Sequence, residues 1–390
     1  MSDLANSSRI RPGRSDKINL LVLMALFLVW SASFCLPRDA RSADRKRILI
    51  VSSYHREYRW SQETQRGLST ALLDLGYLED PAQAETLIRE DRVESSRVVI
   101  RKLWMDTKRK SEKSEIAKSV ARILDAARQF QPDLLLLGDD NATHYIGSHY
   151  LDTPVPVVYW GINIWPLRYG LLDSVERPGH NVTGVYQPGY LRESLEFLVE
   201  LVPTVQTLAV LGDDSETSLA KIKDLHRQAE SGQLPVRLVA TVVTNNEAEW
   251  KAGALELAKQ ADAIYLSNHN TIKDQQGRPV DSMSLGGWYL RHVRKPDVGD
   301  SKLLVEEGVL CAADDSGFKQ GFEAMRMADR ILAHGADPAT LPPVAPSRGP
   351  IVVNAERARM LGIDLTRLDR KRIEERVEEA AALKQTPEPP

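Results

Sequence analysis

Polar and aromatic side chains gather in four short segments, each of which includes or directly follows the end of an apolar run. The segments are residues 52–60, 138–141, 159–163 and 267–270. Tyrosine and tryptophan offer apolar faces, asparagine and aspartate offer hydrogen-bonding groups, and small residues let backbone amides approach a bound molecule. This mixture suits a small organic solute that has one apolar part and a few polar groups.

The acidic pair Asp139–Asp140 allows three interpretations: a cap at a strand end, acceptors for a ligand amine, or metal ligands. The first two are favoured, because His144 and His149 are five residues apart and poorly placed to share a metal on one helical face. His55 could act with the acidic pair in a hydrolytic enzyme, although no serine or cysteine partner is recognisable. The common nucleophile, phosphate-loop, zinc-protease and dinucleotide motifs are missing from the sequence. We therefore predict no catalytic residue, no metal and no cofactor.

Apolar runs typical of buried strands alternate with helical patterns along most of the chain. Strands are expected at residues 47–53, 96–103, 132–138, 155–161, 206–212, 236–243 and 261–267, and helices at 60–75, 111–130, 194–201, 219–230 and 247–260. This alternation predicts parallel sheets with helices on both faces. The connection 162–190, rich in glycine, proline and asparagine, favours two Rossmann-like α/β lobes over one barrel. Ligands bind such sheets at the carboxyl ends of the strands, where the four segments lie.

The composition excludes several classes of protein. The chain has 390 residues, of which 42% are hydrophobic and 27% charged, as in ordinary globular proteins. Its 51 Lys and Arg are balanced by 54 Asp and Glu, and no basic block stands out, so nucleic acid is not an expected partner.

The N-terminus has the pattern of an export signal. Basic residues at positions 9–17 precede an uncharged apolar run at 20–30. We expect residues 1–43 to be a signal peptide and the protein to be periplasmic, with an uncleaved membrane anchor as the alternative. Cys311 is then the only cysteine of the mature chain, so no internal disulfide can form. At the other end, alternating charges predict a solvated helix over 369–384 and a frayed tail.

Several motifs resemble those of a family of periplasmic solute-binding proteins of ABC transporters. Residues 177–184 have the pattern R-P-G-x-N-V-T-G and precede a helix that ends at Pro203. Residues 351–362 have the pattern of an apolar strand ending in asparagine and a helix ending A-x-x-L-G, and residues 315–321 lead through glycine into a helix. One branch of the family is similar also in its opening S-Y-H-x-x-Y-x-W and in a segment M-D-T-K-R, here residues 53–60 and 105–109.

The resemblance implies a type I periplasmic-binding-protein fold, whose two lobes are joined by three crossings and close on ligand about a hinge. It places the first lobe at 46–187 plus 309–345 and the second at 188–308 plus 346–370, with a C-terminal helix and tail at 371–390. Characterised relatives take up amino acids, including aromatic ones.

We therefore expect a monomeric binding protein, not an enzyme, which holds a small amino-acid-like ligand between its lobes. Its partner would be an ABC permease, or a membrane sensor protein if the chain is a sensing module. Tyr54, Tyr58 and Trp60 would form apolar walls. The remaining candidate ligand-binding residues are Ser53, His55, Asp139, Asp140, Asn141, Gly161 and Asn163 from the first lobe, and Asn268, Asn270 and Asp315 from the second.

Overall fold

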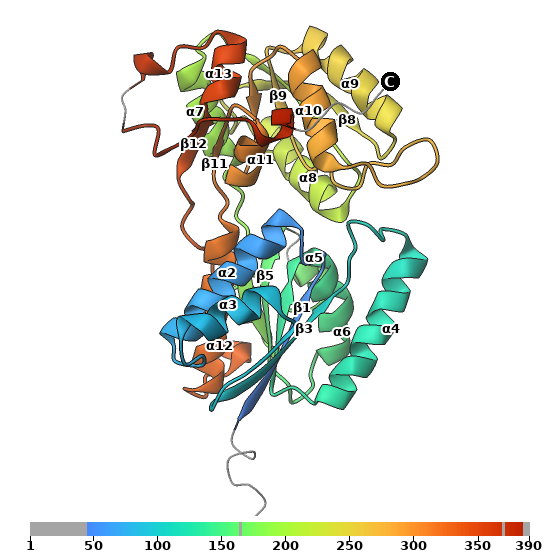
Figure 1. The fold of residues 1–390 in the computed structure, drawn as a ribbon, viewed down its shortest axis with the longest axis vertical. Coiled ribbons are helices and arrows are strands. Elements are labelled where there is room, and N and C mark those ends of the chain that lie inside the picture. Colours follow the sequence, from blue (N-terminus) through green and yellow to red (C-terminus); the bar gives the residue numbers. More distant parts are fainter. Residues whose placement is uncertain (1–44, 164–165, 369–370, 385–390) are drawn as a thin grey trace, which may run out of the picture. The chain divides into compact units, whose positions relative to one another are not determined.

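The computed structural model describes residues 45–163, 166–368 and 371–384. The expected signal peptide, residues 1–43, lies outside the described residues. None of the helices in the described ranges has the length and apolar character that a membrane span requires. From Lys46 onward the chain forms one unit that contains two sheets (Figure 1).

The first sheet has the order β2-β3-β1-β4-β5-β6. Its strands are β1 (Lys46–Ser52), β2 (Arg92–Glu94), β3 (Val98–Trp104), β4 (Leu134–Gly138), β5 (Val157–Ile162) and β6 (Val182–Tyr186). All neighbours are parallel except β2, which is antiparallel to β3. Strands covered on both faces need continuous apolar runs rather than alternating ones, and Leu134–Gly138 is buried throughout.

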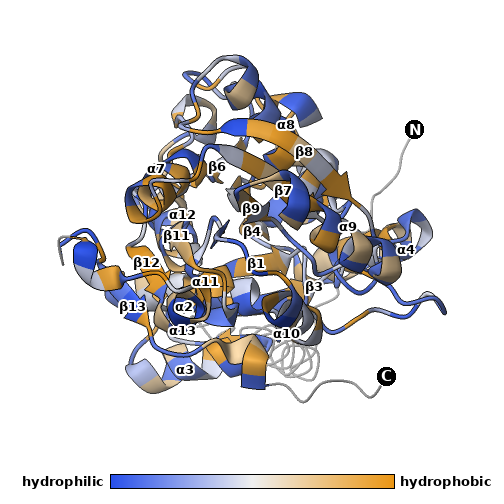
Figure 2. Ribbon diagram, turned by 90° about the horizontal axis from the view of Figure 1, so that it is seen from above, coloured by the Kyte–Doolittle hydropathy of each residue, from blue (hydrophilic) through white to orange (hydrophobic). Residues whose placement is uncertain are grey.

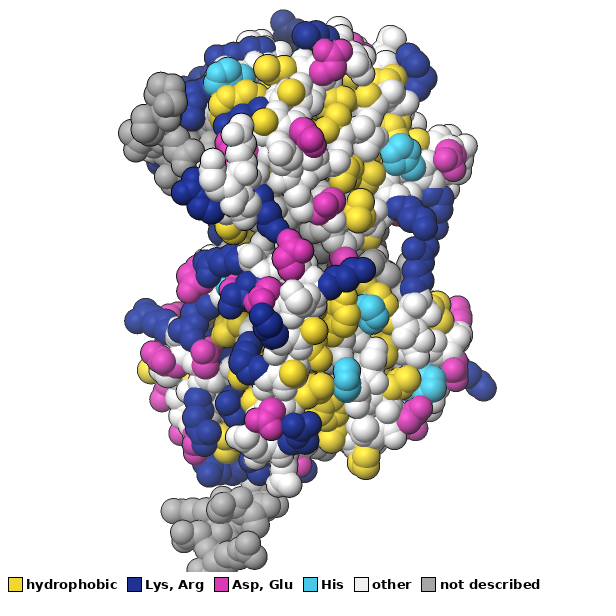
Figure 3. Space-filling model, turned by 90° about the vertical axis from the view of Figure 1, so that its right-hand side faces the viewer, with side chains coloured by type: hydrophobic (Ala, Val, Ile, Leu, Met, Phe, Trp, Pro, Cys, Tyr) yellow, Lys and Arg dark blue, Asp and Glu magenta, His cyan; other side chains and the backbone are white. Residues whose placement is uncertain are grey.

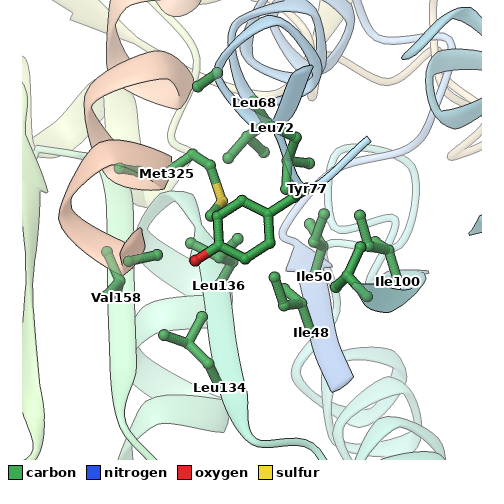
Figure 4. Packing of buried hydrophobic residues seen from close by; sticks show 14 of the residues in the cluster. Ile48, Ile50, Leu68, Leu72, Tyr77, Ile100, Leu134, Leu136, Val158 and Met325 are labelled. Carbon is green, nitrogen blue, oxygen red and sulfur yellow. The ribbon is translucent and has the colours of Figure 1, made fainter. Parts of the chain in front are cut away.

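Helices cover both faces of this sheet. On one face lie α2 (Arg59–Asp74), α3 (Pro81–Arg89) and α12 (Gly317–Leu332). Figure 4 shows their core, in which Leu68, Leu72 and Met325 pack over Ile50 and Leu136. On the other face lie α4 (Lys113–Phe130), α5 (Asp139–Asn141), the π-helical turn η1 (Ala142–Ile146) and α6 (Gly147–Tyr150).

The second sheet has the order β13-β12-β11-β10-β9-β7-β8. Its strands are β7 (Thr207–Gly212), β8 (Arg237–Val243), β9 (Ala263–Leu266), β10 (Asp297–Val298), β11 (Cys311–Ala313), β12 (Ile351–Asn354) and β13 (Glu375–Val377). Around it lie α7 (Leu191–Leu201), α8 (Glu216–Glu230), α9 (Glu247–Gln260), α10 (Ser282–His292), α11 (Lys302–Glu307) and α13 (Ala355–Leu361). In Figure 2 the strands β1 and β12 are hydrophobic, whereas α10 carries residues of both kinds, as expected of strands inside and a helix outside.

The chain passes between the lobes three times: after β6, after β11 and before β12. The second passage differs from the expectation. The resemblance places residues 309–313 in the first lobe, but β11 pairs with β10 and β12 in the second sheet. The first lobe therefore receives α12, which packs beside α2 (Figure 1), and the segment after it, which reaches β6 through a bridge between Val344 and Val185. A three-residue apolar strand suits either sheet equally, so only its pairing assigns it.

The C-terminal helix expected over 369–384 is absent from the described residues 371–384. Instead, β13 adds to the edge of the second sheet parallel to β12, and a short 3₁₀ turn follows at Ala381–Lys384. Ala380 and Ala382 are buried, since this segment packs against α10. The connection 162–190 also differs, because it contains β6. The strands and helices expected between residues 47 and 267 are otherwise present, with shifted ends.

Candidate functional site

A cavity of about 310 Å³ lies between the lobes, at the carboxyl ends of the strands. Its first-lobe wall comes from the loops after β1, β3, β4 and β5, and its second-lobe wall from α8, α11 and the loop after β9. The predicted residues that line it are Tyr54, His55, Tyr58, Trp60, Asp139, Asn163, Asn268, Asn270 and Asp315. Figure 3 shows cationic and anionic side chains together at the constriction between the lobes.

The other predicted residues do not line this cavity, and most of them hold its wall in place. Ser53 donates its hydroxyl to the Gly138 carbonyl at 2.6 Å and accepts from the Ala142 amide at 2.8 Å, which ties β1 to the turn after β4. The Asn141 amide donates to the Thr107 hydroxyl at 2.9 Å and lines a neighbouring cavity.

Gly161 is the position at which Trp60 and Asp139 approach the backbone. Its φ is +69°, a conformation that favours glycine. A Cβ there would lie 2.8 Å from Asp139 Oδ1 and 3.5 Å from Trp60 Nε1. Asp139 itself has a φ of +67°, which non-glycine residues rarely adopt and which often marks functional sites.

The aromatic wall is joined to polar groups at its edges. The Trp60 indole donates to Asp139 Oδ1 at 2.7 Å. The rings of Tyr54 and Tyr58 meet edge to face with centroids 5.0 Å apart. Their hydroxyls reach the second lobe, where the Tyr54 hydroxyl lies 3.0 Å from the Thr217 hydroxyl and the Tyr58 hydroxyl accepts from the Asn270 side-chain amide at 3.2 Å.

A chain of hydrogen bonds leads from the first lobe to two of the crossings. Asp140 accepts from the Asn163 backbone amide at 3.0 Å, and the Asn163 side chain donates to Gln187 at 2.8 Å. Gln187 in turn donates to Asp315 at 3.1 Å. Asp315 lies on the crossing between β11 and α12, so the network joins the β5 end to the hinge segments.

The carboxyl groups here are deeply buried. Burial raises the pKa of Asp139 well above its usual value, and hydrogen bonding to Trp60 opposes that shift. Burial also raises the pKa of Asp315 to about 7; the Lys221 ammonium lowers it, and Asp300 and Asp314 raise it further. A ligand ammonium would therefore stabilise the ionised form of these carboxyl groups, which burial disfavours.

A buried ion pair lies next to the second-lobe asparagines. His269, which lies between them, contacts Glu307 with Nε2 2.7 Å from Oε1. Burial opposes the charged imidazolium, but the Glu307 carboxylate outweighs it and raises the pKa of His269 to about 9. Asp213, directly after β7, accepts from the Asn270 backbone N–H at 2.9 Å.

Two lysines in the cavity were not predicted. Lys221 on α8 forms an ion pair with Asp300, with Nζ 2.7 Å from Oδ2. Lys108 is buried beside the tyrosines. The M-D-T-K-R segment contained a signal for Lys108, but no strand end or spacing indicated that its side chain faces the other lobe.

His55 lines the cavity with its Nδ1 3.3 Å from Asp106. Burial is the main cause that lowers its pKa, and Arg109 adds to the effect. No serine or cysteine is hydrogen-bonded to His55 within the described ranges, and no group of three or more possible metal ligands occurs there. The site therefore offers binding groups rather than an assembled nucleophile and base.

Asp315 makes stability depend on pH. Its pKa is raised in the folded protein, so folded chains bind a proton more tightly than unfolded ones, and stability should increase as the pH falls from 7 towards 4. This residue should contribute about 2 kcal/mol between pH 7 and 5. Denaturant unfolding at pH 7 and at pH 5 should show that the free energy of unfolding rises less in Asp315→Asn than in the parent protein. The exposed Asp125→Asn variant should keep the full gain, and an equal gain in Asp315→Asn would contradict the prediction.

A family model described as "ABC transporter substrate binding protein" matches residues 101–370. A tyrosine-binding protein of Clostridioides difficile is 23% identical over 208 residues, which is 53% of this chain. The match spans only 57% of that relative's length.

Solved structures share the fold. An ABC domain from Streptococcus pneumoniae in complex with L-Trp has a TM-score of 0.65 at 21% identity, over 85% of this chain and 100% of the other. A conserved domain protein from Vibrio cholerae has a TM-score of 0.66 at 16% identity, over 85% of this chain and 99% of the other. A third structure is the ligand-free, open form of a substrate-binding protein with adhesive properties from Clostridium difficile. It has a TM-score of 0.60 at 19% identity, over 85% of this chain and 98% of the other. These likenesses confirm the expected two-lobed α/β fold.

Proposed function

Since the chain belongs to the family of ABC transporter substrate-binding proteins, we propose that it captures a small amino-acid-like solute between its lobes and delivers it to an ABC transporter. Membership of this family confirms the resemblance seen in the sequence motifs and the expectation of a binding protein that is not an enzyme. The observation that carries the proposal is the cavity between the lobes, which combines aromatic walls with buried groups of both charges.

The lining suits an amino acid better than a sugar or a simple acid. Tyr54, Tyr58 and Trp60 provide aromatic surface for an apolar side chain. Asp139 and Asp315 are buried acceptors suited to an ammonium group. The names of two similar proteins, one tyrosine-binding and one in complex with L-Trp, point the same way.

Closure of the lobes would couple binding to delivery. The lobes already contact through Lys273 and Glu112 at 2.7 Å, through an ion pair of Arg59 with Glu306, and through Tyr54. A ligand that contacts both walls binds the closed state more tightly than the open one and so shifts the population towards closure. The permease, or the alternative membrane sensor, would recognise the closed pair of lobes on the extracytoplasmic side.

A thermal-shift screen of amino acids, nucleosides and short organic acids tests the proposal. L-tyrosine and L-tryptophan are expected to raise the unfolding midpoint in proportion to the logarithm of their concentration. A screen in which no amino acid raises the midpoint would contradict the proposed ligand class. A second assay then separates transport from sensing: it asks whether the ligand-bound protein stimulates a permease or a sensor kinase.

Trp60→Phe should weaken binding of the amino acid found by this screen by about 10-fold. Phenylalanine keeps an aromatic wall but cannot donate to Asp139, whose carboxyl then turns towards other donors. Isothermal titration calorimetry measures the change. Trp104→Phe is the matched control, because the Trp104 indole donates to Asp91 outside this cavity. Equal affinities of the Trp60→Phe variant and the parent would contradict the assigned role of Trp60.

A further inference from the structure

Lys108 carries a buried ammonium group that faces the space between the lobes. The residue is only 5% exposed and lines the cavity at the end of the loop after β3. The loop is held firmly, because Thr107 donates both its amide and its hydroxyl to the Ser53 carbonyl, at 3.0 and 2.9 Å. The backbone from which the Lys108 side chain extends is thus held by contacts within the first lobe.

The ammonium of Lys108 lacks the partner that a buried charge requires. Within the described part of the chain it donates no hydrogen bond, and no carboxylate lies within ion-pair distance. Its neighbours are the ring of Tyr54, 4.8 Å from Nζ to the centroid, and that of Tyr58, at 5.8 Å. The buried Lys102 and the partly buried Lys221 are satisfied, since Lys102 donates to backbone carbonyls and Lys221 pairs with Asp300. An unpaired buried charge destabilises a protein unless a partner arrives.

We propose that Lys108 is the specificity-determining residue that binds the carboxylate of the ligand. This inference rests on the proposed function and adds to it the chemical group that the protein selects. The ligand would be a zwitterion, with its carboxylate on Lys108 and its ammonium towards Asp139 and Asp315.

The surrounding charges favour a single carboxylate over a phosphate. The ammonium of Lys108 feels the buried carboxyls of Asp213, Asp139 and Asp140. Among the described residues that line the cavity, the other lysine and arginine side chains already pair with carboxylates: Lys221 with Asp300, Arg59 with Glu306 and Arg109 with Glu57. A doubly charged group would therefore meet one available cation among several carboxyls, whereas a single carboxylate is matched by one ammonium.

A structural role for Lys108 makes a different prediction. If the ammonium only held Tyr54 and Tyr58 through its contacts with their rings, its removal would destabilise the ligand-free protein. If the ammonium instead serves to bind the ligand carboxylate, Lys108→Met removes an unpaired buried charge while keeping an apolar side chain. The ligand-free unfolding midpoint of Lys108→Met should then equal or exceed that of the parent, as when binding groups are held at the expense of stability.

The selectivity test compares L-tyrosine with tyramine, which is the same molecule without the carboxylate. Calorimetry should show that the parent protein prefers L-tyrosine by about 10- to 100-fold, the range expected of a charged hydrogen bond. Lys108→Met should lose this preference through weaker binding of L-tyrosine, with tyramine affinity unchanged. Lys110→Met is the matched control on the same loop, since Lys110 is exposed and should leave the preference intact.

Several outcomes would overturn the inference: an unchanged preference in Lys108→Met, an equal loss for both compounds, or a lower ligand-free midpoint. If the parent protein binds no amino acid, the proposed function fails separately. The inference is then decided with 3-(4-hydroxyphenyl)propionate, which has the carboxylate without the amine. Binding by the parent that Lys108→Met abolishes supports the inference, and no binding by the parent overturns it.

Discussion

Replacing Arg357 with methionine is expected to lower the free energy of unfolding by about 3–5 kcal/mol. The guanidinium is completely buried and forms an ion pair with Asp297, with Nη2 2.5 Å and Nε 3.0 Å from Oδ2. It also donates to the backbone carbonyls of Leu290 and Val293, at 3.2 and 3.0 Å. One side chain thus joins α13, β10 and the end of α10.

The loss is large because methionine leaves the Asp297 carboxylate without its charged partner in the interior. Urea unfolding followed by circular dichroism measures it. The control is Arg359→Met on the same helix, where the side chain is exposed and the change should be within about 0.5 kcal/mol. The double variant Arg357→Met with Asp297→Asn should be more stable than Arg357→Met alone. A single variant as stable as the parent would show that the pair is not needed.

Gly321→Val is expected to lower the free energy of unfolding by about 3 kcal/mol, at the upper end of overpacking effects. Gly321 on α12 lies against the backbone of α2, and a Cβ there would be 2.1 Å from the Thr64 carbonyl oxygen. Gly67 makes the reciprocal contact, with its Cβ position 1.9 Å from the Phe318 carbonyl oxygen. The two backbones touch, so no side chain can move aside to make room.

Because valine at position 321 would push α12 away from α2, the substitution should also weaken ligand binding. The crossing that carries Asp315 leads into α12, and Gly317 at the start of α12 packs on the Trp60 ring. Thermal unfolding and titration with L-tyrosine measure the two effects. Arg326→Val, on the exposed side of the same helix, introduces the same branched residue and should change both little. If Gly321→Val unfolded at the same temperature as the parent protein, the helices could move apart without loss of stability, which would contradict the prediction.

The strand-end segments were predictable because their positions follow from local patterns. Tyr54, Asp139, Asn163 and Asn268 each come directly or closely after an apolar run, and the carboxyl ends of parallel strands meet at one edge of a sheet. Those residues accordingly line the cavity. Gly161 is predicted to bind ligand on the same grounds, but in the structure its lack of a side chain leaves room for Asp139 and Trp60 against the backbone.

Residues outside the strand ends gave no such signal. Thr217 and Lys221 are on α8, where polar residues ordinarily face solvent, and Glu307 is at the end of α11. They reach the cavity because the second lobe lies over the first, a relation that no local spacing describes. The same holds for Lys108, whose burial depends on both lobes.

The sequence by itself determined the alternation of strands and helices, the two-lobed α/β class and the family, since apolar periodicity and short motifs are properties of neighbouring residues. Only the tertiary structure decided that β11 belongs to the second sheet, that the segment after residue 371 adds a strand, and that Lys108 faces the same cavity as the predicted Asp315. Hydrogen-bonded pairing and burial involve residues far apart in the chain, so a short segment such as Cys311–Ala313 or Glu375–Val377 takes its place from its neighbours in space.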